Sequence, residues 1–321
     1  MRLTRDTASP KANNRWGRTP RIAVVYLHGD MIDGESRYIP FVGLRLAGSA
    51  TVAAALKSAR EDSSVKAVVF RVETGGGSSL AADVILREAM LTARAKPFVV
   101  SMGSAAASGG YYASVGGGTI FANRATLTGS IGIFYGKVDM SGLLEKIGIG
   151  VEQFRSSPRA DAESFFRPFS DDERRELGVK VKQFYDLFVG RVADGRKKTA
   201  DEVDAVARGK VWTGAQALER GLVDKLGGLR EALAEARRLA DLPYDAPLLE
   251  LPPEGGSLIG LLLELAGLPK FLAGAPTPTA LPPLLSEAVR SVAPLFAYEP
   301  EKMLARSEFV VDDPPTEPLE E

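Results

Sequence analysis

Apolar and polar positions follow two alternating patterns along the chain from residue 21 onward. Ile22–Leu27 and Ala67–Val72 are continuous apolar runs, which are typical of buried strands, whereas Thr51–Glu61 between them repeats its apolar positions at helical spacing. This order predicts a βαβ unit. The pattern then predicts a helix over Leu80–Ala95, a strand over Pro97–Met102, a short helix over Ser108–Ser114, and strands over Thr119–Ala122 and Ser130–Phe134.

Alternation of this kind is typical of an α/β fold in which helices cover the faces of a parallel sheet. In such a sheet, ligands bind beyond the carboxyl ends of the strands, where the loops carry polar groups. Gly75–Gly77 follows one predicted strand, and Ser104–Ser108 follows the next. We therefore expect both loops at the same edge of the sheet, where they can build one site.

Past Ser170 the pattern is helical. It predicts a long helix from Asp171 to about residue 193, and shorter helices over Ala200–Ala207, Gly214–Arg220 and Leu229–Ala240. Composition divides the chain into a basic, polar leader over residues 1–20, a folded domain over residues 21–241, and an extension over residues 242–321. The extension is rich in Pro and Leu and ends in an acidic tail, and we expect the leader and this tail to be disordered.

Composition and charge exclude some classes of function. Of the 321 residues, 45% are hydrophobic and 25% charged, and 40 basic side chains balance 41 acidic ones, so nucleic acid is not an expected partner. The chain has no cysteine and one histidine, His28, which excludes thiolate chemistry and zinc sites built from Cys or from two His. We expect neither a metal nor a cofactor.

The sequence has no apolar stretch typical of a secretory signal in its first 20 residues, and no apolar window long enough to span a membrane. The nearest candidate, Leu258–Leu268, is short and carries Glu264. We expect this segment to pack on its own protein or on a neighbouring protomer, with a membrane surface as the alternative.

Ser108 is the main candidate for chemistry. It lies in Ala105-Ala-Ala-Ser-Gly-Gly-Tyr-Tyr112, directly after a predicted strand and at the start of a predicted helix. Small neighbours would let another chain approach, and the first-turn amide of Gly109 would point toward developing negative charge. Taken alone, a serine in this context is more often a helix N-cap than a nucleophile.

Gly75–Gly77 could serve as a tight turn, a phosphate cradle or an oxyanion hole. The phosphate role is disfavoured, because neither the Lys-Ser/Thr pair of a Walker loop nor the glycine spacing of a dinucleotide loop is present. A second loop bracketed by glycines follows the next strand. Two backbone N–H groups that converge on one point form an oxyanion hole, so this pairing favours the oxyanion role.

Four stretches together resemble the signal peptide peptidase A family of serine proteases, peptidase family S49: Arg71–Ser78, Ser101–Tyr112, Leu127–Ile133 and Gly209–Ala217. Their order and spacing match the family across residues 21–241. The resemblance implies a Clp protease/crotonase-like fold, with a parallel sheet of repeated ββα units and, here, a helical carboxyl-terminal extension.

The resemblance also implies roles for individual residues. Ser108 would be the nucleophile, the amides of Gly77 and Gly109 would form the oxyanion hole, and Ser130 would orient the base. Gly76 and Tyr111 would contact the substrate, and the substrate would be a peptide. Family members also form ring or dome oligomers and usually work at the cytoplasmic membrane, so we expect a homo-oligomer, while the compartment stays open.

This chain departs from the family pattern at two places. Glu73-Thr-Gly-Gly-Gly77 stands where the family usually has Asn-Ser-Pro-Gly-Gly, so the loop loses its rigid proline. The family's general base is a lysine, and that position falls on Ala160. Neighbouring Arg159 cannot replace it, because a guanidinium stays protonated. In this respect the chain resembles the carboxyl-terminal half of the long, duplicated members, in which the amino-terminal half supplies the lysine.

The source of the base is therefore open: a separate lysine-bearing subunit or paralogue, an amino-terminal half, another lysine of this chain, or none in an inactive chain. We expect Lys137 and Lys146 to be solvated, Lys210 to anchor the start of a helix, and His28 to be structural at the end of a strand.

Three functions remain under consideration. The first is a serine endopeptidase that cleaves short apolar peptides, such as signal peptide remnants. The second is an inactive scaffold or regulatory subunit that binds peptides. The third, an acyl-CoA enzyme of the crotonase type, is disfavoured because those enzymes commonly use carboxylates. Leu258–Leu268 and Leu281–Phe296 are candidate contacts between protomers.

Overall fold

The computed structural model describes residues 19–39, 44–252 and 303–306. Within these residues the main sheet runs in the order β11-β9-β7-β5-β1-β13, with β8 and β12 joined at its side. Neighbouring strands of this sheet are parallel except for the pair formed by β9 and β11. Its strands are β1 (Arg21–His28), β5 (Val65–Thr74), β7 (Phe98–Ala107), β8 (Thr119–Ala122), β9 (Leu127–Gly129), β11 (Val211–Thr213), β12 (Lys225–Leu226) and β13 (Leu248–Leu251). The predicted α/β fold with a parallel sheet is confirmed.

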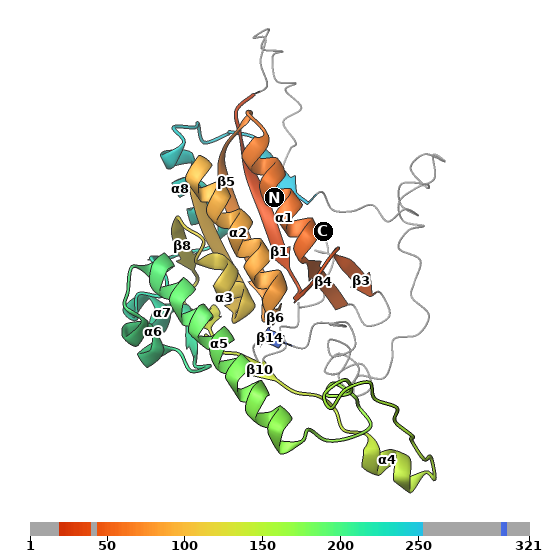
Figure 1. The fold of residues 1–321 in the computed structure, drawn as a ribbon. Helices are drawn as coiled ribbons and strands as arrows, with labels where there is room; N and C mark the ends of the chain where they lie inside the picture. The colour runs from red at the N-terminus through yellow and green to blue at the C-terminus, as the bar shows by residue number, and fades with distance from the viewer. Residues whose placement is uncertain (1–18, 40–43, 253–302, 307–321) are drawn as a thin grey trace, which may run out of the picture.

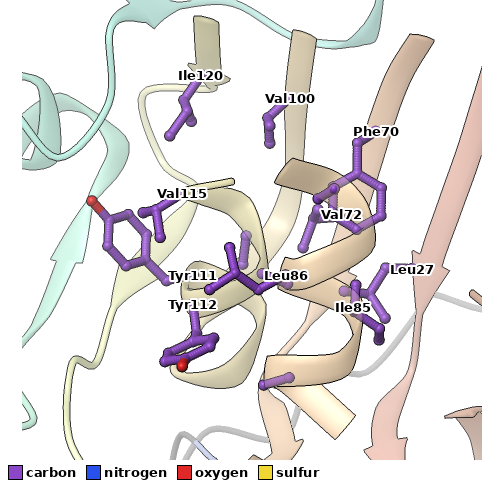
Figure 2. Close-up of a cluster of buried hydrophobic side chains, with 14 of the residues drawn as sticks. Leu27, Phe70, Val72, Ile85, Leu86, Val100, Tyr111, Tyr112, Val115 and Ile120 are labelled. Atoms are coloured by element: carbon purple, nitrogen blue, oxygen red, sulfur yellow. The ribbon is translucent and has the colours of Figure 1, made fainter. Parts of the chain in front are cut away.

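The main sheet separates two layers of core because alternate side chains of a strand point to opposite faces. On one face lie α1 (Ser49–Glu61), α2 (Ser79–Ala95) and α3 (Gly109–Ser114), and on the other lies α8 (Leu229–Leu239). Ala23 and Val25 of β1 belong to the larger cluster, whereas Ile22 and Val24 belong to the smaller one under α8. Figure 2 shows Leu27, Phe70 and Val100 of the sheet facing Ile85 and Leu86 of α2.

A second, smaller sheet lies at the carboxyl ends of the main strands. Its order is β10-β14-β6-β2-β4-β3. The strands are β2 (Asp30–Ile32), β3 (Arg37–Ile39), β4 (Leu44–Gly48), β6 (Gly76–Ser78), β10 (Phe134–Tyr135) and β14 (Met303–Arg306). This sheet was not predicted, because runs of two to five residues are too short to show periodicity.

The helices past Ser170 are present as predicted. They are α5 (Asp171–Arg196), α6 (Ala200–Val206) and α7 (Gly214–Glu219), and α4 (Ser141–Lys146) precedes them. Ser170 caps α5 by accepting a hydrogen bond from the backbone of Glu173, whose carboxylate accepts one from the backbone of Ser170 in return.

Two predicted strand boundaries are wrong. β7 continues past Met102 as far as Ala107, because the small residues that were expected in a loop still pair with β5 and β9. The strand expected over Ser130–Phe134 is displaced: β9 ends at Gly129, and β10 begins at Phe134. Gly129 has a φ of 78°, which turns the chain out of the sheet at the residue before the predicted strand was to begin.

The main sheet also continues past the domain end expected at residue 241, because β13 pairs with β1. Within the described residues, no helix is long and apolar enough to cross a membrane. Leu258–Leu268 and Leu281–Phe296, the segments expected to form contacts, lie outside the described residues.

Candidate active site

Ser108 links the end of β7 to α3 in an unusual backbone conformation. Its φ is 51° and its ψ is −117°, a combination that side-chain-bearing residues rarely adopt. Hydrogen bonds hold it from both sides: its N–H donates to the Gly129 carbonyl at 2.8 Å, and its carbonyl accepts from the Tyr112 N–H at 2.8 Å. Strain of this kind persists only where the surroundings fix it, and it is concentrated at functional sites.

The Ser108 hydroxyl is fully buried. Among the described residues, its Oγ has no hydrogen-bond partner. A buried polar group without a partner costs roughly 1–3 kcal/mol, so native structures rarely keep one without a role. The alternative role of Ser108 as a side-chain N-cap is not fulfilled, because its side chain makes no capping hydrogen bond to α3.

The glycine loop after β5 is shaped by contacts that only glycine allows. Gly76 and Gly77 have φ values of 111° and 148°, and a Cβ on Gly77 would lie 2.2 Å from the Met31 carbonyl oxygen. Thr74 Oγ1 accepts a hydrogen bond from the Gly76 N–H at 3.0 Å and donates to the Gly76 carbonyl at 3.3 Å. These two hydrogen bonds stiffen the loop, which lacks the family's proline.

The two loops expected at one edge do meet there. α3, which begins with Gly109, packs against β6, which contains Gly76 and Gly77. Ser130 is brought close to Ser108 by the pairing of β7 with β9, since Gly129 accepts the Ser108 amide and Ser130 follows Gly129 directly. Ser130 also has a positive φ, 48°, and its N–H donates to the Lys210 carbonyl at 2.8 Å.

Glu73 was expected only as a departure from the family pattern, yet its side chain takes part in the candidate site. Its carboxylate accepts hydrogen bonds from the backbone N–H of Ser104 at 2.8 Å and of Ala105 at 3.2 Å. The Arg71 guanidinium forms an ion pair with this carboxylate at 3.4 Å and donates a hydrogen bond to the Met102 carbonyl. The signal that could have revealed it is an acidic side chain at the end of a strand, directly before the glycine loop.

These hydrogen bonds satisfy backbone N–H groups that lie in a bulge of β7. Val72 faces Met102, yet Thr74 faces Ala106, so β7 carries additional residues between the two pairs. Gly103 lies inside the bulge, and any Cβ there would collide with the Glu73 carboxylate. Because the bulge adds residues to β7, it determines where Ser108 lies along the edge of the main sheet.

Tyr111 does not line a groove, contrary to the expectation. It is fully buried on the core side of α3, its hydroxyl donates to the Leu222 carbonyl at 2.8 Å, and burial raises the pKa of Tyr111 well above its usual value. Its neighbour Tyr112 lines an apolar cavity of about 250 Å³ instead. Other residues around this cavity are Leu80, Ala82, Ile133, Phe184 and Leu187.

The position expected for the base offers none. Ala160 is exposed in a turn, where its N–H donates to the Ser157 carbonyl. Lys146 is exposed on α4, and the Lys210 ammonium donates to the Ala205 carbonyl. His28 ends β1 opposite Glu73, as expected for a residue at a strand end.

Lys137 was expected in solvent, and this prediction is wrong. Its Nζ lies 4.2 Å from the centre of the Phe169 ring and donates to the Ala162 carbonyl at 2.6 Å. Desolvation of the amine lowers the pKa of Lys137. Lys137 nevertheless makes its hydrogen bond to Ala162 and not to the Ser108 hydroxyl, which has no partner among the described residues.

Comparison with known proteins connects this geometry with a family. The model of Peptidase family S49 matches residues 91–243. Protease 4 of Salmonella typhi is 40% identical over 222 residues, which are 69% of this chain and 35% of that protein. Protease 4 of Haemophilus influenzae is 37% identical over 250 residues, 76% of this chain and 40% of its own length. This chain therefore spans about a third to two fifths of these two relatives.

A shorter relative is matched over most of its length. A putative protease of Synechocystis is 35% identical over 199 residues, which are 61% of this chain and 72% of that protein. Among solved structures, a mutant of the 1510-N membrane-bound stomatin-specific protease matches with a TM-score of 0.45 and 14% identity, covering 74% of this chain and 100% of that one.

Proposed function

Since the chain belongs to peptidase family S49, we propose that it is a serine peptidase in which Ser108 is the nucleophile. The observation that carries this proposal is the state of Ser108 itself. Its hydroxyl is buried without a described partner on a strained backbone, beside the glycine loop. A strained, fully supported serine at a strand-to-helix junction is the arrangement that presents a nucleophile to a carbonyl.

In the proposed reaction, Ser108 Oγ attacks the scissile carbonyl carbon while a base removes its proton. The backbone N–H groups of Gly77 and Gly109 stabilise the tetrahedral oxyanion, as donors fixed before the reaction begins. The base then protonates the leaving amine, and an acyl-enzyme ester remains on Ser108. Water, deprotonated by the same base, attacks the ester and releases the second product.

The base in this proposal is a neutral lysine from another polypeptide segment, either a lysine-bearing subunit or an amino-terminal half. Two observations support this choice. Ala160 is exposed at the expected position, and Lys137 donates its hydrogen bond to the Ala162 carbonyl and not to the Ser108 hydroxyl. Ser130 would then orient the incoming amine from the loop that also holds the backbone of Ser108.

For the substrate, we propose short peptides with apolar side chains. The cavity beside Tyr112 supports this, because its walls are mostly aliphatic and aromatic and it begins one turn along α3 from Ser108. We also propose that the chain assembles with copies of itself. α4 contains no buried residue, and Ile147, Ile149 and Phe154 around it are exposed.

The test is labelling of Ser108 by a fluorophosphonate probe, with the chain alone and after mixing with a lysine-bearing paralogue or half. Labelling only after mixing is the expected result, and the Ser108→Ala variant is the matched control. Labelling of the chain alone would remove the need for an external base.

A second candidate is a non-catalytic peptide-binding subunit. Ala160 is the observation that favours it, since it removes the family's base from this chain. Absence of labelling under both conditions, with peptide binding retained, would select this function over the first.

A further inference from the structure

Ser79, at the start of α2, carries a second buried hydroxyl without a partner. The residue is only 9% exposed, and its Oγ has no hydrogen-bond partner among the described residues. It is not needed to cap the helix, because Ser78 is the N-cap and accepts the hydrogen bond from the Ala81 N–H. Native structures rarely keep a buried polar group unpaired without a role, so a ligand that pairs with this hydroxyl would recover the cost of burying it.

Ser79 lines the cavity beside Tyr112, which lies between α2, α3 and α5 (Figure 1). Three aromatic side chains contribute to its walls: Tyr112, Phe184 and Phe188. The rings of Tyr112 and Phe188 meet edge to face, with their centres 4.9 Å apart. The volume of about 250 Å³ is far more than the roughly 10–15 Å³ that one water needs, so the cavity has room for a large side chain.

The other ionisable side chain in the cavity wall is already paired. Asp83 lies one helical turn after Ser79 on the same face of α2. Its carboxylate accepts a hydrogen bond from the Tyr112 hydroxyl at 2.7 Å and lies 3.6 Å from the Arg191 guanidinium. Because this charge is balanced, the cavity has no need of a cation. What it lacks is one hydrogen bond, at Ser79.

The cavity adjoins the proposed nucleophile. Ser79 follows Gly77, a proposed oxyanion donor, by two residues, and the Tyr112 N–H donates to the carbonyl of Ser108 one turn earlier in α3. A peptide whose carbonyl carbon reaches Ser108 therefore has the side chain beside its scissile bond close to this cavity. The residues that line the cavity then determine which side chain binds.

We propose that the cavity binds a tyrosine side chain of the substrate, and that Ser79 selects it through a hydrogen bond to the phenol hydroxyl. The inference rests on the proposed function, because it takes the bond that Ser108 cuts to lie beside that tyrosine. The phenol ring packs against the aromatic walls, and the serine hydroxyl can donate or accept. A site that hydrogen-bonds a substrate hydroxyl discriminates against the analogue without it. The substrate class thereby narrows from apolar side chains to an aromatic ring with one hydroxyl.

Two matched peptides test this preference. Both are fluorescent, have blocked ends and consist of alanines around one central residue, which is tyrosine in the first and phenylalanine in the second. Their affinities are measured by anisotropy on the full chain carrying Ser108→Ala, so that no peptide is consumed. We expect the tyrosine peptide to bind about tenfold more tightly than the phenylalanine peptide, which corresponds to one additional hydrogen bond.

Substitutions of Ser79 then locate the preference. Ser79→Ala should bind the tyrosine peptide about tenfold more weakly and leave the phenylalanine peptide unaffected, whereas Ser79→Thr, which keeps a hydroxyl, should retain the preference. Ser79→Ala should also resist urea at least as well as the unaltered chain, because it removes an unpaired buried hydroxyl. The matched control is Ser114→Ala, which removes a buried, hydrogen-bonded hydroxyl of α3 that does not line the cavity and should keep the preference.

The inference is overturned if both peptides bind with equal affinity, if neither binds, if Ser79→Ala keeps the tyrosine preference, or if Ser79→Ala is less stable than the unaltered chain. All four results are obtained without turnover. Failure of Ser108 to react with the fluorophosphonate would therefore count against the proposed function alone. Normal labelling of Ser108 together with equal peptide affinities would count against the role of Ser79 alone.

Discussion

The carboxylate of Glu73 accepts the backbone N–H of Ser104 through both of its oxygens, at 2.8 and 3.0 Å. This contact joins two strands that each lead into one part of the site. β5 continues from Glu73 into the glycine loop, and β7 continues from Ser104 to Ser108. The glycine loop and Ser108 therefore share one anchor, which fixes their relative position.

Replacement of Glu73 should loosen that anchor. Glu73→Ala leaves the N–H groups of Ser104 and Ala105 without their acceptor, so we expect a loss of about 2 kcal/mol in the free energy of unfolding by urea. Amide hydrogen exchange at these two residues should accelerate by at least about tenfold. Glu73→Gln keeps one acceptor oxygen, so its stability should fall between that of the unaltered chain and that of Glu73→Ala. Glu61→Ala, at an exposed helix end, is the control, and equal effects at both sites would refute the anchor.

Ser108 should show the cost of its backbone conformation. A residue with a Cβ at a φ of 51° is strained, and glycine is not, so Ser108→Gly should be more stable to urea than Ser108→Ala by about 1 kcal/mol. Both variants should lose labelling by the fluorophosphonate. If the alanine variant proves as stable as the glycine variant, the strain is not present in solution.

Long and strongly patterned elements were the predictable part of this fold. α1, α2, β1 and β5 follow from apolar spacing, because burial on a large core enforces a regular period. The second sheet has no such signal. β6 contains only Gly76, Gly77 and Ser78, and its place is determined by β2 and β14, strands from distant parts of the chain.

The site was predictable only where a local motif carries it. Ser108, Ser130 and the glycine loop lie in short patterns, and pairing of neighbouring strands brings them together. Tyr111 was misplaced because two adjacent tyrosines on a helix point in directions that sequence does not distinguish. The anchor at Glu73 depends on a bulge in β7, and a bulge appears only when two strands are compared in register.

The burial of Tyr111 leads to a separable pair of variants. Tyr111→Phe removes the donor to the Leu222 carbonyl inside the core, so we expect a loss of about 1–2 kcal/mol in unfolding free energy and unchanged peptide affinity. Tyr112→Phe removes a hydroxyl that donates to Asp83 at the rim of the cavity, so the smaller stability loss is expected there. Equal losses of unfolding free energy would contradict the difference in burial between the two hydroxyls. A change in peptide affinity for Tyr111→Phe alone would instead place Tyr111 in the substrate groove.

Acid should weaken the start of α5 through Glu173. Its carboxylate accepts two hydrogen bonds from Arg167, at 2.6 and 2.8 Å, and one from the Ser170 backbone, and together these lower the pKa of Glu173 to about 2. A carboxyl whose pKa is lower in the folded state stabilises the fold above its unfolded pKa of about 4.3 and loses that contribution as the pH falls toward 2.

The unfolding free energy of the unaltered chain should therefore fall between about pH 4.3 and pH 2 more steeply than that of Glu173→Gln, measured by urea unfolding at each pH. The glutamine variant should be less stable at pH 7, and the two curves should converge toward pH 2. Glu176→Gln, an exposed position on the same helix, is the control for general acid effects. Parallel curves for the unaltered chain and Glu173→Gln would show that the capping network at Ser170 contributes no pH-dependent stability.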